Sequence, residues 1–143
     1  MTHRRPSGVT LVELVVVLAI LGSISATAMP RFIAFQDRLR ARGAASLLTR
    51  ALLDARHLAA RRGTRTAVRV DTASTVLTVQ NANGPIARHD LQAVFGVAIS
   101  ATRDSLAYLP DGLGFGASNA RFIVTRGAAA ETVTVSRIGR VRR

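Results

Sequence analysis

Two groups of residues in this sequence could do chemistry: an acid inside an apolar run, and a cluster of arginines at the other end. Glu13 is the only charged residue between Gly8 and Pro30. A carboxylate costs about 2.5–3.5 kcal/mol at the centre of a membrane-spanning helix, so an acid in such a segment indicates a function and needs a partner. The chain closes on Gly139-Arg140-Val141-Arg142-Arg143. Guanidinium groups suit phosphate because they are planar, permanently charged and able to bind it with two parallel hydrogen bonds.

The remaining polar residues give no pattern typical of an enzyme. The chain has no cysteine, which excludes thiolate nucleophiles and thiolate metal sites. His57 and His89 stand apart in the sequence, without carboxylate companions. The glycines between Gly112 and Gly116 have neither a lysine nor a following helix, so they do not predict a phosphate-binding loop. We expect no catalytic activity, no cofactor and no metal.

The acid lies in the first turn of an expected helix. From Thr10 to Pro30 a helix would be roughly 30 Å long, about the thickness of the hydrocarbon core of a bilayer. Arg4 and Arg5 precede this segment. Basic residues on one side of a span hold that side in the cytoplasm, so the rest of the chain is expected on the other side of the membrane.

Three interpretations of the segment compete. The first is a secretory signal peptide with Ala26-Thr27-Ala28 as its cleavage site. The second is a plain single-span anchor. The third is cleavage just before the segment, between Gly8 and Val9. Glu13 favours the third, because only that cut creates an α-amino group, on Val9, that can pair with the acid of a neighbouring copy.

The stretch Ser7-Gly8-Val9-Thr10-Leu11-Val12-Glu13-Leu14 resembles the processing site of type IV pilins and pseudopilins. The resemblance implies that a prepilin peptidase cuts between Gly8 and Val9 and methylates the new N-terminus. Val9 departs from the usual phenylalanine, although that position accepts other apolar residues. The resemblance also implies that Glu13 serves assembly with other pilin or pseudopilin subunits. It places the chain in a bacterial inner membrane as a single-pass protein with a periplasmic C-terminal domain, and then in a pilus or pseudopilus.

After Pro30 the pattern of a helix continues. Small and apolar residues recur at spacings of three and four and predict one buried stripe: Ala41, Ala44, Ala45, Leu48, Leu52, Ala55, Leu58 and Ala59. Gly63 after two arginines is a typical helix end. We therefore expect one long helix from Thr10 to Arg62, kinked at Pro30.

The rest of the chain is predicted to be a mainly antiparallel sheet packed on this helix, an α+β fold of the type IV pilin kind. The domain plan is a leader (1–8), a transmembrane helix (9–30), an amphipathic helix (31–63), a sheet domain (64–138) and a basic tail (139–143). Residues 81–85 read as a turn, and Leu91 to Ser100 as a core strand interrupted at Gly96. The predicted strands are 66–70, 75–80, 91–100, 106–109, 121–125 and 132–138. The tail is expected to leave the sheet.

The C-terminal stretch from Leu106 to Arg143 resembles the GspH/FimT group. That group contains FimT-type minor pilins of type IV pili and H-type minor pseudopilins of type II secretion systems. Gly139-Arg140-Val141-Arg142 is similar to the G-R-x-R motif by which FimT-type proteins are thought to hold DNA during uptake in natural transformation. Aromatic residues do not alternate with these arginines, so binding to duplex DNA should be independent of sequence. The DNA-binding residues are predicted to be Arg137, Arg140, Arg142 and Arg143, with Arg121 and Arg126 beside them. The alternative is a GspH-type pseudopilin of a type II secretion system.

Overall fold

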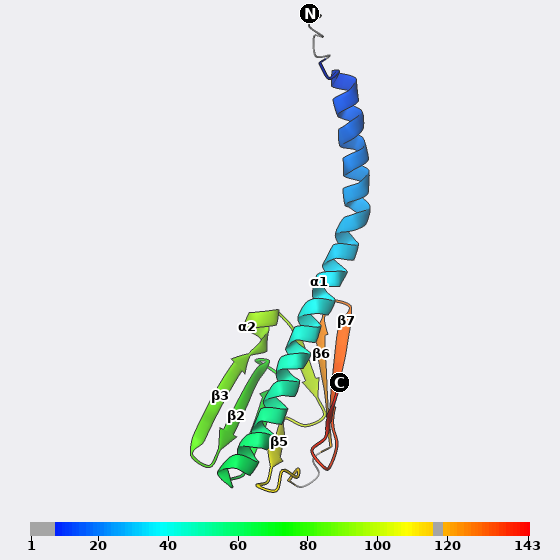
Figure 1. Cartoon of the computed structure of the whole chain (residues 1–143). Coiled ribbons are helices and arrows are strands. Elements are labelled where there is room, and N and C mark those ends of the chain that lie inside the picture. Colours follow the sequence, from blue (N-terminus) through cyan, green and yellow to red (C-terminus); the bar gives the residue numbers. More distant parts are fainter. Residues whose placement is uncertain (1–7, 116–118) are drawn as a thin grey trace, which may run out of the picture. The chain divides into compact units, whose positions relative to one another are not determined.

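The computed structural model describes residues 8–115 and 119–143, and the chain divides into two units, Met1–Phe35 and Gln36–Arg143. Helix α1 runs from Leu11 to Arg62 and contributes to both units (Figure 1). Within the first unit every described side chain is exposed. The second unit holds the remainder of α1, every strand and the hydrophobic core.

Helix α1 confirms the predicted helix to within one residue at its start and ends at Arg62 as predicted. Gly63 follows in the left-handed region, with φ +61°, where an L side chain would be strained. The predicted stripe is buried except for Leu58, which is half-buried, and Ala51 joins it. Small residues dominate the stripe, which lets strands approach the helix closely.

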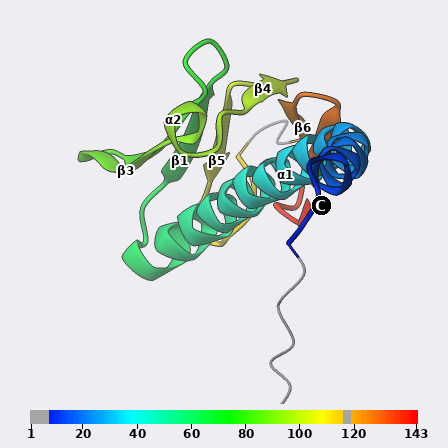
Figure 2. The same cartoon turned by 90° about the horizontal axis from the view of Figure 1, so that it is seen from above.

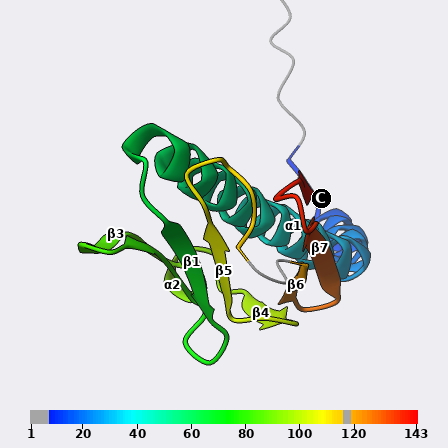
Figure 3. The same cartoon turned by 90° about the horizontal axis from the view of Figure 1, so that it is seen from below.

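The strands form two antiparallel four-stranded sheets, with orders β3-β2-β1-β5 and β4-β6-β7-β8. Their bounds are β1 Thr66–Asp71, β2 Val76–Asn81, β3 Gly84–Asp90, β4 Ala98–Ala101, β5 Ser105–Tyr108, β6 Ala120–Arg126, β7 Ala129–Val135 and β8 Val141–Arg142. Figures 2 and 3 look at the second unit from opposite ends, and both show the strands curving around one side of α1. The α+β prediction is confirmed, with two sheets where one was expected.

The prediction of a core strand from Leu91 to Ser100 is wrong in its first half. Residues Leu91–Phe95 form a short helix, α2, and only Ala98–Ala101 is a strand. Asp90 caps the helix, because its carboxylate accepts the N–H of Ala93 at 2.8 Å, and Gly96 ends it in the left-handed region with φ +61°. Periodicity cannot distinguish a short apolar run in a strand from one in a helix, so the capping residues decide.

Strand β3 was missing from the prediction, which treated residues 81–85 as a turn. Only Ala82 and Asn83 form the turn, and β3 starts at Gly84. It is an edge strand, where Pro85 is tolerated because one side of the strand needs no ladder hydrogen bonds. An edge strand with few buried side chains carries no alternating apolar pattern, so the sequence held little signal for it.

The prediction that the basic tail leaves the sheet is also wrong. Strand β7 ends at Val135, three residues earlier than expected, and the chain turns back as β8. Thr134 pairs with Arg142 and Val135 with Val141. The half-buried side chain of Val141 packs against the core, so its burial joins the tail to the sheet.

Candidate functional site at the two ends of the chain

The predicted processing site is open to solvent. Gly8, Val9 and Thr10 precede the helix without regular secondary structure, and the Val9 side chain is 72% exposed. A protease binds its substrate in an extended conformation, so this arrangement leaves the bond between Gly8 and Val9 accessible. Residues 1–7 of the predicted leader (1–8), including Arg4 and Arg5, lie outside the described residues.

Glu13 lies one turn after Thr10, which caps helix α1. The backbone N–H of Glu13 donates to Thr10 Oγ1 at 3.2 Å. Thr-x-x-Glu at a helix start is the spacing of a capping box, a signal that was present in the sequence and was missed. The cap uses the backbone of Glu13, so its carboxylate remains available and lies at the positive end of the helix dipole.

The apolar part of α1 meets the requirement of a lipid environment. It contains a window with a mean hydropathy of 2.2 and no burial within the described chain, long and apolar enough to cross a membrane. Its hydroxyl groups bond to the helix itself: Ser23, Ser25 and Thr27 donate to backbone carbonyls at 2.8–2.9 Å. These polar groups therefore need no partner from water.

At the other end of the chain, the arginines are presented by a three-residue turn. The N–H of Ser136 donates to the carbonyl of Arg140, and the N–H of Gly139 donates to the carbonyl of Ser136, both at 2.9 Å. The Ser136 hydroxyl also accepts the N–H of Arg140 at 3.2 Å. Gly139 adopts φ +75°, as expected for the last residue of a hairpin loop of this length. The glycine of the Gly-Arg-x-Arg motif is therefore required by the backbone of the turn.

A second turn of the same hydrogen-bonding pattern lies against it. Leu109 N–H donates to the carbonyl of Leu113, and Gly112 N–H donates to the carbonyl of Leu109, both at 2.9 Å. Its loop contains Pro110, Asp111 and Gly112, residue types that favour turns. A Cβ added to Gly139 would lie 3.4 Å from the Gly112 carbonyl oxygen and 3.1 Å from Cε1 of Tyr108. The arginine turn thus packs on the second turn and on a tyrosine ring.

Tyr108 is buried beneath these turns, and its burial raises its pKa to about 12, although nearby Arg56 opposes the shift. It is the only tyrosine in the chain, so the near-ultraviolet absorbance of tyrosinate reports it alone. We expect a titration midpoint near pH 12 for the folded chain and near 10 in concentrated urea. Because the folded pKa is the higher one, the contribution of Tyr108 to stability should be constant below pH 10 and fall between 10 and 12. A folded-state midpoint near 10 would contradict the burial.

The structure brings three of the predicted arginines together. Arg137, Arg140 and Arg142 line one hollow of about 490 Å³ beside the end of β7. Arg121 on β6 pairs in register with Thr134 on β7, which pairs with Arg142 on β8. Neighbouring strands are about 4.8 Å apart, so Arg121 and Arg142 are about 10 Å apart along this row. The row alternates with buried residues, which places it on the sheet face turned away from the core. We call Arg121, Arg137, Arg140 and Arg142 the arginine surface.

Arg126 does not belong to the arginine surface, because its guanidinium group is used inside the fold. It is ion-paired with Asp37 of α1 at 2.9 Å and donates to the carbonyls of Phe95 and Gly96 at 2.6 Å. It lies at the opposite end of β6 from Arg121, about 17 Å along the strand. Gly96 and Gly127 make room for this contact, since a Cβ at either position would collide with Arg126 or Asp37. Proximity in sequence could not reveal this role.

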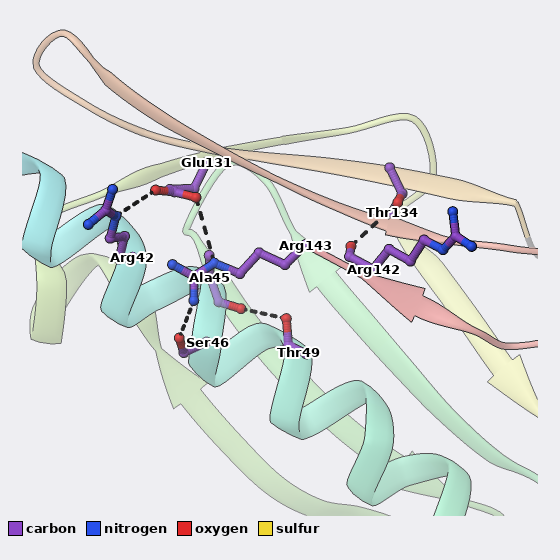
Figure 4. A network of polar contacts seen from close by, with 8 residues as sticks. All are labelled: Arg42, Ala45, Ser46, Thr49, Glu131, Thr134, Arg142 and Arg143. Carbon is purple, nitrogen blue, oxygen red and sulfur yellow. Dashed lines mark hydrogen bonds and ion pairs between the residues drawn. The ribbon is translucent and has the colours of Figure 1, made fainter.

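Arg143 also points away from the arginine surface. Its side chain lies against α1, where it donates to the Ser46 hydroxyl at 2.7 Å and pairs with Glu131 at 3.6 Å. Glu131 also pairs with Arg42 at 3.1 Å. Figure 4 shows this network and the Arg142 side chain extending away from it. Successive side chains near a strand point to opposite faces, so Arg142 and Arg143 are separated by the sheet.

Comparisons with known proteins bear on the N-terminal motif and on the fold. Residues 3–29 match the family model described as the prokaryotic N-terminal methylation motif. The fold is similar to the type IV minor pilin FimU of Pseudomonas aeruginosa, with a TM-score of 0.63, 18% identity, and coverage of 76% of this chain and 90% of that chain. The chain therefore carries an N-terminal methylation motif and has a type IV pilin-like fold.

The pilin-like fold is equally evident in a secretion protein. The minor pseudopilin EpsH from the type 2 secretion system of Vibrio cholerae is similar with a TM-score of 0.59, 19% identity, and coverage of 72% of this chain and 94% of that chain. No curated protein sequence matches the chain significantly.

One feature of the pilin-like domain differs from the sequence prediction. His57 and His89 were expected to stand apart, but both line a hollow of about 280 Å³ between α1 and β3, together with Asp54. Among the residues that the structure describes, no three histidine, aspartate or glutamate side chains are arranged to hold a metal ion. Neither histidine has a role in the site described above.

Proposed function

We propose that this chain is a minor type IV pilin of the FimT kind, which enters a pilus through its N-terminal helix and binds duplex DNA during uptake. In this proposal a prepilin peptidase cuts between Gly8 and Val9 and methylates Val9. The apolar half of α1 then holds the chain in the inner membrane, with residues 36–143 in the periplasm, until Glu13 pairs with the amine of another subunit.

The arginine surface carries the DNA-binding part of the proposal. Three guanidinium groups line one hollow, and Arg121 continues them along a single row. Within the described chain, Arg121, Arg140 and Arg142 form no ion pair with a carboxylate. The surface lies on the exposed sheet face, where a rigid duplex can approach. Contacts of this kind are made to phosphates and carry no sequence information.

Replacing Arg140 and Arg142 together with glutamine should weaken binding to duplex DNA. Each phosphate contact contributes about −0.9 to the slope of log affinity against log salt concentration, so four contacts predict about −3.6 and two about −1.8. The measurement is fluorescence anisotropy of a labelled duplex, with the full chain in detergent micelles across a salt series.

The matched control is the chain in which Arg42 and Arg143 are replaced with glutamine. It loses the same charge, but from side chains that pair with Glu131 beside α1. Its salt slope should stay near that of the unchanged chain. An equal decrease in both variants would mean that total charge, and not the arginine surface, determines binding.

The likeness to EpsH favours a second candidate, a minor pseudopilin of a type II secretion machine. There, the arginine surface would face acidic groups on other minor pseudopilins or on cargo. Salt-dependent binding to duplex DNA that requires Arg140 and Arg142 supports the pilin. Its absence, together with secretion of cargo that fails without this chain, supports the pseudopilin.

A further inference from the structure

We propose that Tyr108 is a positioning residue for the arginine surface: its ring holds Gly139 in place and so determines where Arg137 and Arg140 project. This inference rests on the proposed DNA binding. Tyr108 itself does not contact the ligand. It acts through the turn of residues 136–140, which we call the arginine turn.

The arginine turn is closed by short-range hydrogen bonds and continues into a short strand. The bonds that close it join Ser136 to Gly139 and Arg140, all within the turn. The strand that follows, β8, has only two residues and pairs with only Thr134 and Val135. So short a hairpin is marginal without packing against other elements. Packing against the core therefore contributes to holding the arginine turn in one position.

Gly139 provides this packing through direct contact between backbone and ring. It is buried, although its neighbours Ile138 and Arg140 are exposed. A Cβ at Gly139 would lie 3.1 Å from Tyr108 Cε1, which is closer than side chains normally pack. The backbone of the turn therefore lies directly on the ring, and its φ of +75° also favours glycine.

Tyr108 is a fixed support for this contact. It is 1% exposed, belongs to the core cluster, and pairs in register with Thr66 of β1. Its hydroxyl has no hydrogen-bond partner among the described residues. A buried hydroxyl without a partner costs stability. The aromatic ring must therefore provide the support, and phenylalanine should replace tyrosine without loss.

The consequence for binding is preorganisation. Arg140 directly follows the buried glycine and Arg137 precedes it by two residues, so their backbone positions follow that of Gly139. With the turn held on the ring, phosphates meet guanidinium groups that need little further ordering. If the turn is released from the ring, the same charges remain but no longer lie together in one hollow.

The test compares DNA affinities of full chains in detergent micelles. Gly139→Ala and Tyr108→Leu should each reduce affinity for a labelled duplex by about tenfold at low salt, the loss expected for one phosphate contact. Tyr108→Phe should bind as the unchanged chain does. Gly63→Ala is the matched control: Gly63 also has a positive φ, +61°, but a Cβ there meets no atom within 4 Å. The Gly63→Ala variant introduces the same type of backbone strain and should leave DNA affinity unchanged.

A second measurement does not depend on DNA. Hydrogen exchange at the amides of Gly139 and Arg140 should accelerate in Tyr108→Leu and remain slow in Tyr108→Phe. Equal affinities of Gly139→Ala and Gly63→Ala for DNA, or unchanged exchange in Tyr108→Leu, would overturn the inference. Failure of the unchanged chain to bind DNA would instead remove the proposed function, while the exchange rates would still decide whether Tyr108 holds the turn.

Discussion

Replacing Arg126 with alanine is expected to lower the free energy of unfolding of the domain by about 3 kcal/mol. The change removes the ion pair with Asp37 and both hydrogen bonds to the C-terminal end of α2. Asp37 and the two carbonyl groups would remain without their partner in a region that is largely closed to water. Urea unfolding of residues 36–143 measures the effect, because this fragment contains every residue of the core.

The control for this prediction is Arg42→Ala. Arg42 also joins α1 to the second sheet through one carboxylate, Glu131, at 3.1 Å. Its side chain is 60% exposed, compared with 23% for Arg126. Exposed ion pairs contribute at most about 1 kcal/mol, so Arg42→Ala should change stability little. Similar losses of stability in the two variants would show that Arg126 is an ordinary exposed arginine, available to join the arginine surface.

Replacing Glu13 with alanine should prevent incorporation into filaments without affecting cleavage of the leader. If Glu13 pairs with the Val9 amine of a neighbouring subunit in apolar surroundings, removal of one partner costs several kcal/mol. Because about 1.4 kcal/mol is a factor of ten, incorporation should fall at least about tenfold. Immunoblots of sheared filaments measure incorporation. Mass spectrometry of the membrane-bound chain should find methylated Val9 at the N-terminus in both proteins.

Two further variants separate the charge of Glu13 from its place in the helix cap. Glu13→Gln keeps the size of the side chain but not its charge, and should fail to assemble as Glu13→Ala does. Thr10→Val removes the hydroxyl that accepts the N–H of residue 13, and should assemble normally. Normal assembly of Glu13→Gln would disprove the pairing. A mature N-terminus at Met29 would show instead that the segment is an ordinary signal peptide.

Much of the fold could be predicted because its signals are local. The length of α1 follows from a continuous helical pattern between Thr10 and Gly63, and most strands follow from short β-rich runs between turn residues. The errors occurred where local signals are ambiguous. Leu91–Phe95 is an apolar run whose helical state depends on Asp90 and Gly96. Strand β3 buries few side chains, so no apolar alternation marks it in the sequence. It is defined by its hydrogen bonds to β2.

The two ends of the chain differ in how much the sequence decides. At the N-terminus, Gly8, Val9 and Glu13 lie within six consecutive residues, so order along the chain was enough to propose their roles. At the C-terminus, six arginines were proposed as one patch, and only tertiary structure could divide them. Pairing of β6, β7 and β8 places Arg121 beside Arg142, packing directs Arg126 toward Asp37, and alternation across the sheet sends Arg143 to α1. The sequence by itself determined that the C-terminal cluster is positively charged and that Glu13 lies on the long N-terminal helix. Which charges face solvent together was decided by long-range pairing and packing, because these depend on contacts between residues far apart in the chain.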